Sequence, residues 1–188
     1  MGEKGETNRQ RIVQAADDLF YQKGYEATSF SDIAEAVGIA RGNFYYYFKT
    51  KNDILVAVLQ KRRDDIRAML DEWDKEYPEP RARLKRYILI LVKSQSEIEN
   101  FGCPVGSLCT ELNKLRHALH GEATEMFEIF RLWLEKQFAG IGHKKDAHKL
   151  ALRLMARCQG VSLITSAYSD VDFLHREVEE LQQWIEGL

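Results

Sequence analysis

Hydrophobic residues recur with helical spacing over residues 28–59, and this stretch is the most informative part of the chain. Its first part has apolar residues at i, i+3, i+4 and i+7, namely Phe30, Ile33, Ala34 and Val37. This spacing predicts a short helix with one apolar stripe. Gly38 follows the last apolar position, where a glycine can take the left-handed conformation that closes a helix. The chain is then expected to turn steeply into a second short helix, which gives a helix-turn-helix.

The second short helix has two faces. Phe44 and Phe48 stand at i and i+4 and are expected to point inward. The solvent face is left with Arg41, Asn43, Tyr45, Tyr46 and Lys49, and with Tyr47 half-buried. A tyrosine-rich face without a carboxylate suits a helix that lies in a DNA groove, because phenol hydroxyls reach phosphates and the rings pack on sugars and thymine methyls.

Core packing is the alternative explanation for the five consecutive aromatic residues at 44–48. We accept it for Phe44 and Phe48. Adjacent helical positions lie about 100° apart, so one buried stripe cannot hold all five rings. Tyr45 and Tyr46 are therefore expected to be exposed.

Two capping boxes predict helix starts on either side of this region. Ser29 is followed by Asp32, and Thr50 is followed by Asp53. The second box places Lys51 in the first turn of a fourth helix. There we expect its ammonium and the backbone amides to hold one DNA phosphate together.

Residues 9–59 resemble the DNA-binding domain of the TetR/AcrR family of transcriptional regulators. The matching positions are Gly24-Tyr25, Thr28-Ser29, Asp32-Ile33-Ala34, Val37-Gly38, Gly42, Phe44-Tyr45-Tyr46-Tyr47-Phe48 and Lys51. From the face described above and this resemblance, the expected DNA contacts are Thr28, Ser29, Ser31, Arg41, Gly42, Asn43, Tyr45, Tyr46, Tyr47, Lys49 and Lys51. The resemblance implies an activity class and leaves the signal open.

The rest of the chain is also expected to be helical, because it has three prolines and hardly any alternating strand pattern. Further helices are predicted at 7–23, 51–74, 81–100, 105–118, 122–139, 146–168 and 172–187. The run 87–92 within 81–100 is apolar on all sides, which predicts a helix inside a bundle. The predicted fold class is all-α, with a three-helix DNA-binding domain at 1–51 and a helical ligand-binding and dimerisation domain at 52–188.

Composition narrows the class of protein. The net charge of −2 excludes a polycation that coats nucleic acid, whereas 41–52 holds three cations and no acidic residue. Such a basic patch favours a defined docking face. Three cysteines without a CxxC pair argue against a disulfide framework and a zinc site, so we expect no metal and no cofactor. No apolar run predicts a leader or a membrane span, and the chain is expected to be soluble and cytoplasmic.

Aromatic residues and methionine gather on one face of residues 123–138. Ordinary core packing is the more frequent explanation, but such interiors also bind small apolar ligands. The resemblance implies an inducer pocket between this helix and the one at 81–100. The candidate ligand contacts are Tyr87, Leu91, Gln95, Cys103, Phe127, Phe130 and Gln159.

The last two helices carry apolar stripes that could form a dimer interface. In 146–168 the stripe is interspersed with small residues such as Gly160, and in 172–187 it consists of Leu174, Val178, Leu181 and Ile185. The resemblance implies a homodimer through 146–187, with twofold symmetry matched by two DNA half-sites. The alternative is that both stripes are buried within their own subunit.

Cys103 is a candidate sensor of reactive electrophiles. Gly102-Cys103-Pro104 places it at the cap of a helix, where the positive end of the helix would favour a thiolate. The segment GCPVGSLCTEL is also similar to one in some regulators of this family that sense electrophiles or oxidants. A buried cysteine that acts as a small apolar residue is the alternative.

The sequence therefore predicts a dimeric, ligand-responsive DNA-binding repressor that a small-molecule inducer releases from a palindromic operator. The inducer would tilt the 51–74 helix and change the separation of the two recognition helices, which must match major grooves about 34 Å apart. An activator or architectural DNA-binding protein uses the same domain and stays open. An enzyme with Cys103 as nucleophile is a weak alternative, because no Cys/His/Asp constellation is visible.

Overall fold

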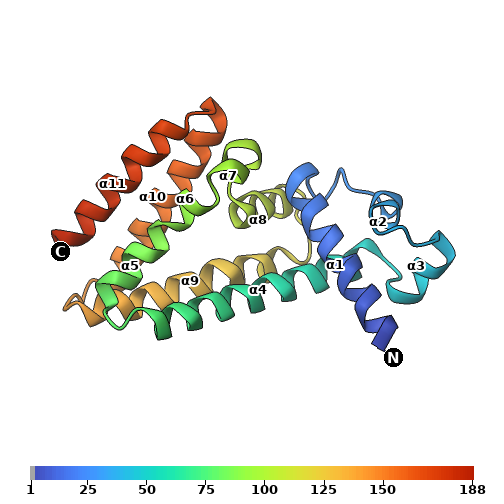
Figure 1. The fold of residues 1–188 in the computed structure, drawn as a ribbon, viewed down its shortest axis with the longest axis horizontal. Coiled ribbons are helices and arrows are strands. Elements are labelled where there is room, and N and C mark those ends of the chain that lie inside the picture. The colour runs from blue at the N-terminus through green and yellow to red at the C-terminus, as the bar shows by residue number, and fades with distance from the viewer. Residues whose placement is uncertain (1–2) are drawn as a thin grey trace. The chain divides into compact units, whose positions relative to one another are not determined.

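The computed structural model describes residues 3–188, and within them the chain forms α-helices and no strand (Figure 1). The side chains of 3–6 and of Arg41 lie outside the described part, so the predicted DNA contact of Arg41 stays a prediction. None of the described helices is long and apolar enough to cross a lipid bilayer. The all-α fold class is confirmed.

The helices fall into two compact units. The first extends through Asp64 and also includes Ser107–Thr124, and the second comprises Asp65–Gly106 and Glu125–Leu188. The helices that begin in the first unit are α1 (Glu3–Lys23), α2 (Phe30–Val37), α3 (Arg41–Tyr47), α4 (Lys51–Glu76) and α9 (His120–Gly140). Those that begin in the second unit are α5 (Pro80–Ile88), α6 (Ile90–Lys93), α7 (Gln95–Phe101), α8 (Pro104–Lys114), α10 (Ala147–Tyr168) and α11 (Val171–Glu186).

These units do not coincide with a linear division at residue 51. The first turns of α4 belong to the first unit because their apolar side chains, Ile54, Leu55, Val58 and Leu59, are fully buried there. Most of α8 and the start of α9 belong to it as well. The helices α4, α8 and α9 therefore each supply residues to both units.

An ion pair joins α1 to α4 inside the first unit. Asp17 accepts from the Arg62 Nε at 2.5 Å and lies 3.3 Å from the Lys61 Nζ. Arg62 is 9% exposed, so its charge is held largely out of water. A buried guanidinium needs such a partner, because desolvating an unpaired charge costs several kcal/mol.

Both predicted capping boxes are present. Ser29 Oγ accepts from the Asp32 amide at 3.1 Å while Asp32 accepts from the Ser29 amide at 2.7 Å. These bonds lower the pKa of Asp32. Thr50 and Asp53 exchange the same two bonds. At each helix start, two backbone amides that have no partner within the helix thereby donate a hydrogen bond, which fixes where α2 and α4 begin.

The single helix predicted at 81–100 is wrong. The structure has α5, α6 and α7 there, with breaks at Leu89 and at Ser94, whose φ of −110° and ψ of 24° leave the helical region. No proline or glycine marks either break, although the β-branched Ile88, Ile90 and Val92 lower helix propensity. The run is also not buried all round, because Leu89 is 37% exposed.

In the second unit, α11 packs along α5, α6 and α7, and α10 packs against α7 and α11 (Figure 1). The α11 stripe faces these helices, since Leu174, Val178, Leu181 and Ile185 are all buried within the subunit. The expectation that this stripe forms the dimer interface is therefore wrong: the neighbouring helices of the same chain already cover it. The outward face of α11 is polar and includes Asp172, His175, Arg176, Glu179 and Glu180.

Candidate functional site

The helix-turn-helix is built by α2, the turn at Gly38 and α3. Gly38 has φ +65°, and the amides after α2 bond back to it, Gly38 to the Glu35 carbonyl and Ile39 to the Ala34 carbonyl. This closure is the predicted left-handed ending, which a residue with a Cβ adopts only under strain. It lets α3 start three residues later at a new angle.

The aromatic residues of α3 divide between core and surface as expected. Phe44 is fully buried against the Phe30 ring, with centroids 5.0 Å apart, and Phe48 is 3% exposed. Tyr46 is 69% exposed and Tyr45 is 41% exposed. Tyr45 stacks on Phe30 with centroids 5.3 Å apart, so its orientation is fixed although its outer edge is open. Burying the phenylalanines therefore presents a tyrosine face to solvent.

Other predicted DNA contacts lie on the same exposed surface. Ser29, Ser31, Gly42, Asn43 and Lys49 are exposed. Lys49 Nζ donates to the Tyr45 carbonyl at 2.6 Å, which holds the cation at the end of α3. Tyr47 is half-buried, and its hydroxyl accepts from Asn8 on α1. Whether these groups contact DNA stays a prediction.

Two of the predicted contacts have other roles in the structure. Thr28 is 0% exposed and its hydroxyl donates to the Gly24 carbonyl at 2.7 Å, so it cannot reach a phosphate from the surface. Lys51 donates to the carbonyls of Tyr25 at 3.0 Å, Glu26 at 3.3 Å and Thr28 at 3.1 Å. An ammonium has three donors, and all three are engaged. Lys51 therefore holds the loop between α1 and α2 in shape, and its contact with a DNA phosphate stays a prediction.

Glu111 holds the same loop from another direction. Its carboxylate accepts from the backbone amides of Tyr25 and Glu26, both at 2.9 Å. Gly24 has φ +90°, and a Cβ there would lie 3.0 Å from a Glu111 oxygen. The glycine thus allows both the left-handed turn and the close approach of the carboxylate. Residue spacing could not reveal this contact, because Glu111 is distant in sequence.

Tyr25 joins this arrangement to the start of α4. Its hydroxyl donates to the Asn52 side chain at 2.5 Å, and its ring packs edge-on against His117, with centroids 5.2 Å apart. Burial raises the pKa of Tyr25, with the nearby carboxylates of Glu26 and Glu111 adding to the shift. The hydroxyl therefore remains a proton donor at neutral pH. His117 also contacts the Asn52 side chain, at 3.3 Å, so it belongs to the support of this loop.

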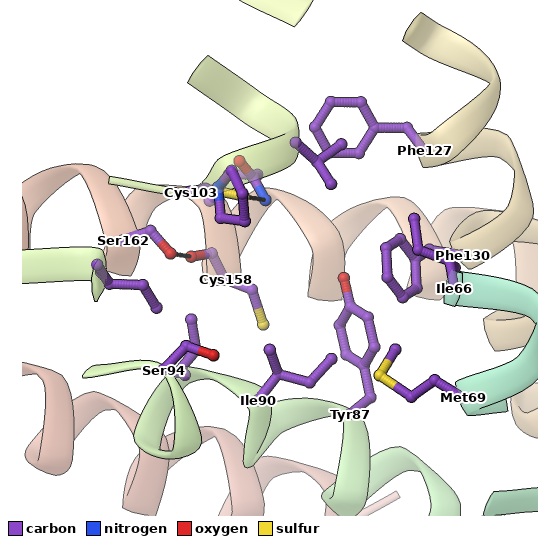
Figure 2. A pocket seen from close by; sticks show the side chains of 15 residues that line it. Ile66, Met69, Tyr87, Ile90, Ser94, Cys103, Phe127, Phe130, Cys158 and Ser162 are labelled. Atoms are coloured by element: carbon purple, nitrogen blue, oxygen red, sulfur yellow. Dashed lines mark hydrogen bonds between the residues drawn. The ribbon is translucent and has the colours of Figure 1, made fainter. Parts of the chain in front are cut away.

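The second unit contains a cavity of about 210 Å³. Six of the seven predicted ligand contacts line it: Tyr87, Leu91, Cys103, Phe127, Phe130 and Gln159. Figure 2 shows side chains from several helices converging on this space. The sequence missed Ile66 and Met69 on α4, whose position relative to the other lining helices has no signature in residue spacing.

Gln95 is the predicted ligand contact that does not line the cavity. The reason is the break at Ser94, after which the side chains of α7 project in new directions. Within the described residues, the buried Gln95 Oε1 has no hydrogen-bond partner. Ser94 itself lines the cavity in its place.

Cys103 and Gln159 are joined at one wall of the cavity. The Cys103 Sγ accepts from the Gly106 amide at 3.4 Å and from Gln159 Nε2 at 3.3 Å. Cys103 is half-buried, whereas Cys109 and Cys158 are buried. Burial raises the pKa of Cys158 to about 12, so that thiol stays protonated. The predicted reactivity of Cys103 stays a prediction, and its place at the cap of α8 is as expected.

Comparisons with known proteins agree with this geometry. Residues 12–58 match the family model of bacterial regulatory proteins, tetR family. An uncharacterised helix-turn-helix regulator of Lactococcus lactis is 24% identical over 185 residues, covering 93% of this chain and 91% of its own. The repressor DhaR of a Mycobacterium species is 27% identical over 129 residues, covering 68% of this chain and 62% of its own.

Among solved structures, a TetR transcriptional regulator from Legionella pneumophila superposes with a TM-score of 0.82 at 26% identity, covering 97% of each chain. The fold, the helix-turn-helix and these relatives define a DNA-binding transcriptional regulator. Residues 12–58 therefore form a DNA-binding domain of the tetR family of bacterial regulatory proteins, and the whole chain has the fold of a TetR transcriptional regulator.

Proposed function

We propose that the protein is a homodimeric repressor that binds a palindromic operator and leaves it when a small molecule occupies the cavity of the second unit. The observation that carries the DNA-binding part is the exposed, carboxylate-free tyrosine face of α3, held by the buried Phe44 and Phe48. Repression is favoured over activation because the relative DhaR is a transcriptional repressor.

Dimerisation is supported by an apolar stripe on α10. Leu152, Ala156, Gly160, Leu163 and Ala167 follow one another at spacings of three or four residues, and all are exposed. Leu163 is 67% exposed, and no atom lies within 4 Å of a Cβ built at Gly160. Single exposed leucines are ordinary, but a continuous row is typical of an interface. A second copy related by a twofold axis would cover this row with its own.

The ligand response is proposed to travel along helices that belong to both units. Helix α8 begins at Pro104, which lines the cavity, and carries Glu111 two turns later on the loop between α1 and α2. Helix α4 likewise lines the cavity with Ile66 and Met69 and contributes its first turns to the DNA-binding unit. A ligand that shifts the start of α8 or the middle of α4 would therefore reposition α3.

Replacing Tyr46 by alanine is expected to weaken operator binding by about tenfold. A tyrosine ring and hydroxyl that contact the DNA backbone or base edges contribute about 1–3 kcal/mol to the binding free energy. A loss of about 1.4 kcal/mol corresponds to a tenfold increase in the dissociation constant. The operator is first obtained by selection from random double-stranded DNA, where a twofold symmetric consensus is expected. Affinity is then measured by fluorescence anisotropy at several salt concentrations.

The variant Tyr46→Phe separates the two contributions of this side chain. If the hydroxyl bonds to a phosphate, Tyr46→Phe loses part of the affinity for every DNA sequence about equally. If the ring reads a thymine methyl, Tyr46→Phe retains the sequence preference that Tyr46→Ala loses. Unchanged operator affinity in Tyr46→Ala would contradict the proposal that α3 lies in the DNA interface.

Replacing Glu111 by glutamine is expected to loosen the α1–α2 loop and to reduce operator affinity several-fold. The Glu111 carboxylate accepts a charge-assisted hydrogen bond from each of two amides. A glutamine side chain is neutral and has one acceptor oxygen, so it cannot hold both amides equally well. Hydrogen exchange at the Tyr25 and Glu26 amides should accelerate by about tenfold, which corresponds to about 1.4 kcal/mol.

The matched control for this variant is Glu26→Gln, which also removes one negative charge, here from the loop that Glu111 contacts. Glu26 is exposed, and its amide rather than its carboxylate takes part in the contact. Electrostatic effects on DNA affinity should be similar in the two variants, whereas the faster exchange should occur only in Glu111→Gln. Equal exchange rates in both would mean that Glu111 does not hold the loop.

A further inference from the structure

The cavity of the second unit is lined without a single ionisable acid or base of the Asp, Glu, Lys, Arg or His type. Its walls are aliphatic and aromatic, with Tyr87, Phe127 and Phe130 as the rings. A charged ligand would lose its hydration here and find no opposite charge. The free energy needed to desolvate an ion is far larger than its attraction to the aromatic rings, so the lining selects for a neutral molecule.

Most polar groups of the lining are already engaged with the protein. Gln159 Nε2 donates to the Cys103 Sγ at 3.3 Å, and Ser162 Oγ donates to the Cys158 carbonyl at 3.0 Å. Gln159 is also fixed by its fit over Gly106, where a Cβ would lie 2.4 Å from its Oε1. These bonds occupy the Ser162 hydroxyl proton and one of the two Gln159 Nε2 protons.

The Tyr87 hydroxyl is different. Tyr87 is 7% exposed, its ring is set by an edge-on contact with Phe130 at 5.5 Å, and its oxygen points into the cavity (Figure 2). Within the described residues, no group accepts a hydrogen bond from it. Burial raises the pKa of this phenol well above its ordinary value, so the hydroxyl carries its proton at every physiological pH. A donor that faces a cavity and has no acceptor among the described residues is a recognition group for a ligand that brings one.

The volume limits the size of the occupant. An apolar cavity of about 150 Å³ holds benzene, so a space of about 210 Å³ has room for one ring with small substituents. We infer that the cavity takes a neutral, single-ring aromatic molecule whose carbonyl oxygen accepts a hydrogen bond from the Tyr87 hydroxyl. The inference rests on the proposed ligand response, and it adds the chemical class of the ligand.

Four probes of nearly equal size test the class of ligand on the full-length protein by calorimetry. These probes are para-methylacetophenone, the isosteric hydrocarbon para-cymene, the anion para-toluate and the cation tolyltrimethylammonium. The ketone and the hydrocarbon are expected to bind, and both ions are expected to bind at least about 100-fold more weakly, because the lining offers no opposite charge. Binding of either ion as tightly as the ketone would overturn the inference.

The variant Tyr87→Phe tests the hydrogen bond. The ratio of the dissociation constants for ketone and hydrocarbon should shift by about fivefold toward the hydrocarbon, as expected for one hydrogen bond of about 1 kcal/mol. Using the ratio cancels any general change in the stability or volume of the cavity. Tyr77→Phe, at a half-buried tyrosine outside the cavity, should leave the ratio unchanged. A ratio that Tyr87→Phe does not change would overturn the assignment of Tyr87.

Operator affinity measured with and without para-methylacetophenone separates this inference from the proposed function. Binding through Tyr87 together with weaker operator affinity supports both. Binding through Tyr87 with unchanged operator affinity supports the ligand class and contradicts ligand-induced release. Failure of the ketone to bind contradicts the ligand class, and the operator experiments with Tyr46→Ala are unaffected by it.

Discussion

Replacing Leu163 by arginine is expected to convert the proposed dimer to a monomer and to weaken operator binding by about 100-fold or more. Leu163 is 67% exposed on the apolar stripe of α10. Because a twofold interface contains each substitution twice, two guanidinium groups would be buried without partners, at a cost of several kcal/mol. A monomer contacts only one half-site. In a dimer, binding of the first half-site brings the second subunit close to the other half-site, and this effective concentration raises the affinity by a factor of about 10²–10⁴.

The measurement is analytical ultracentrifugation of the variant beside Leu132→Arg. Leu132 is 57% exposed on α9, so this control introduces the same charge at a similar exposure away from the stripe. Helicity and melting temperature should be nearly unchanged in the control, and its dimer should persist. An intact dimer in Leu163→Arg would place the interface on another surface.

Replacing Asp17 by alanine is expected to lower the free energy of unfolding by about 3 kcal/mol. The substitution leaves Arg62, which is 9% exposed, without the carboxylate that its Nε contacts at 2.5 Å. Removing one member of a largely buried ion pair typically costs about 3–5 kcal/mol, and we take the lower end because Lys61 also contacts Asp17 near solvent. The pair joins α1 to α4, so operator binding should be lost with it.

Asp18→Ala is the matched control, because Asp18 is the next residue on α1 and is exposed. Its carboxylate accepts from the Gln14 side chain at 2.9 Å on the helix surface. Such surface contacts contribute a few tenths of a kcal/mol. Urea denaturation should therefore separate the two variants clearly. Equal midpoints would show that the ion pair contributes no net stability, which is possible where desolvation cancels the attraction.

The α10 stripe and the α11 stripe show why a hydrophobic pattern alone does not identify an interface. Both helices have apolar residues at helical spacing. In α11 these residues are buried by α5, α6 and α7, whereas in α10 a second row, from Leu152 to Ala167, remains exposed. Periodicity shows that a face must be covered. Which element covers it depends on packing between segments that are far apart in the sequence.

The sequence by itself determined the all-α class, the helix-turn-helix and both capping boxes, because each depends on contacts within a few residues. Gly38 closes α2, and the Asp32 and Asp53 carboxylates cap their own helices. The spacing of Phe44 and Phe48 likewise decided which aromatic residues of α3 face the core. Local geometry and helical periodicity are sufficient for features of this kind.

The tertiary structure alone decided which polar groups are available for function. Lys51 has the right charge and place for a phosphate contact, but three loop carbonyls occupy its ammonium. Glu111 lies in the segment that was singled out for Cys103, and nothing in its spacing indicates that it holds the amides of Tyr25 and Glu26. Gln95, which follows a helix break, does not line the cavity, whereas Tyr87 points its hydroxyl into it. Whether a hydrogen-bonding group is already satisfied depends on long-range packing, and residue spacing does not contain that information.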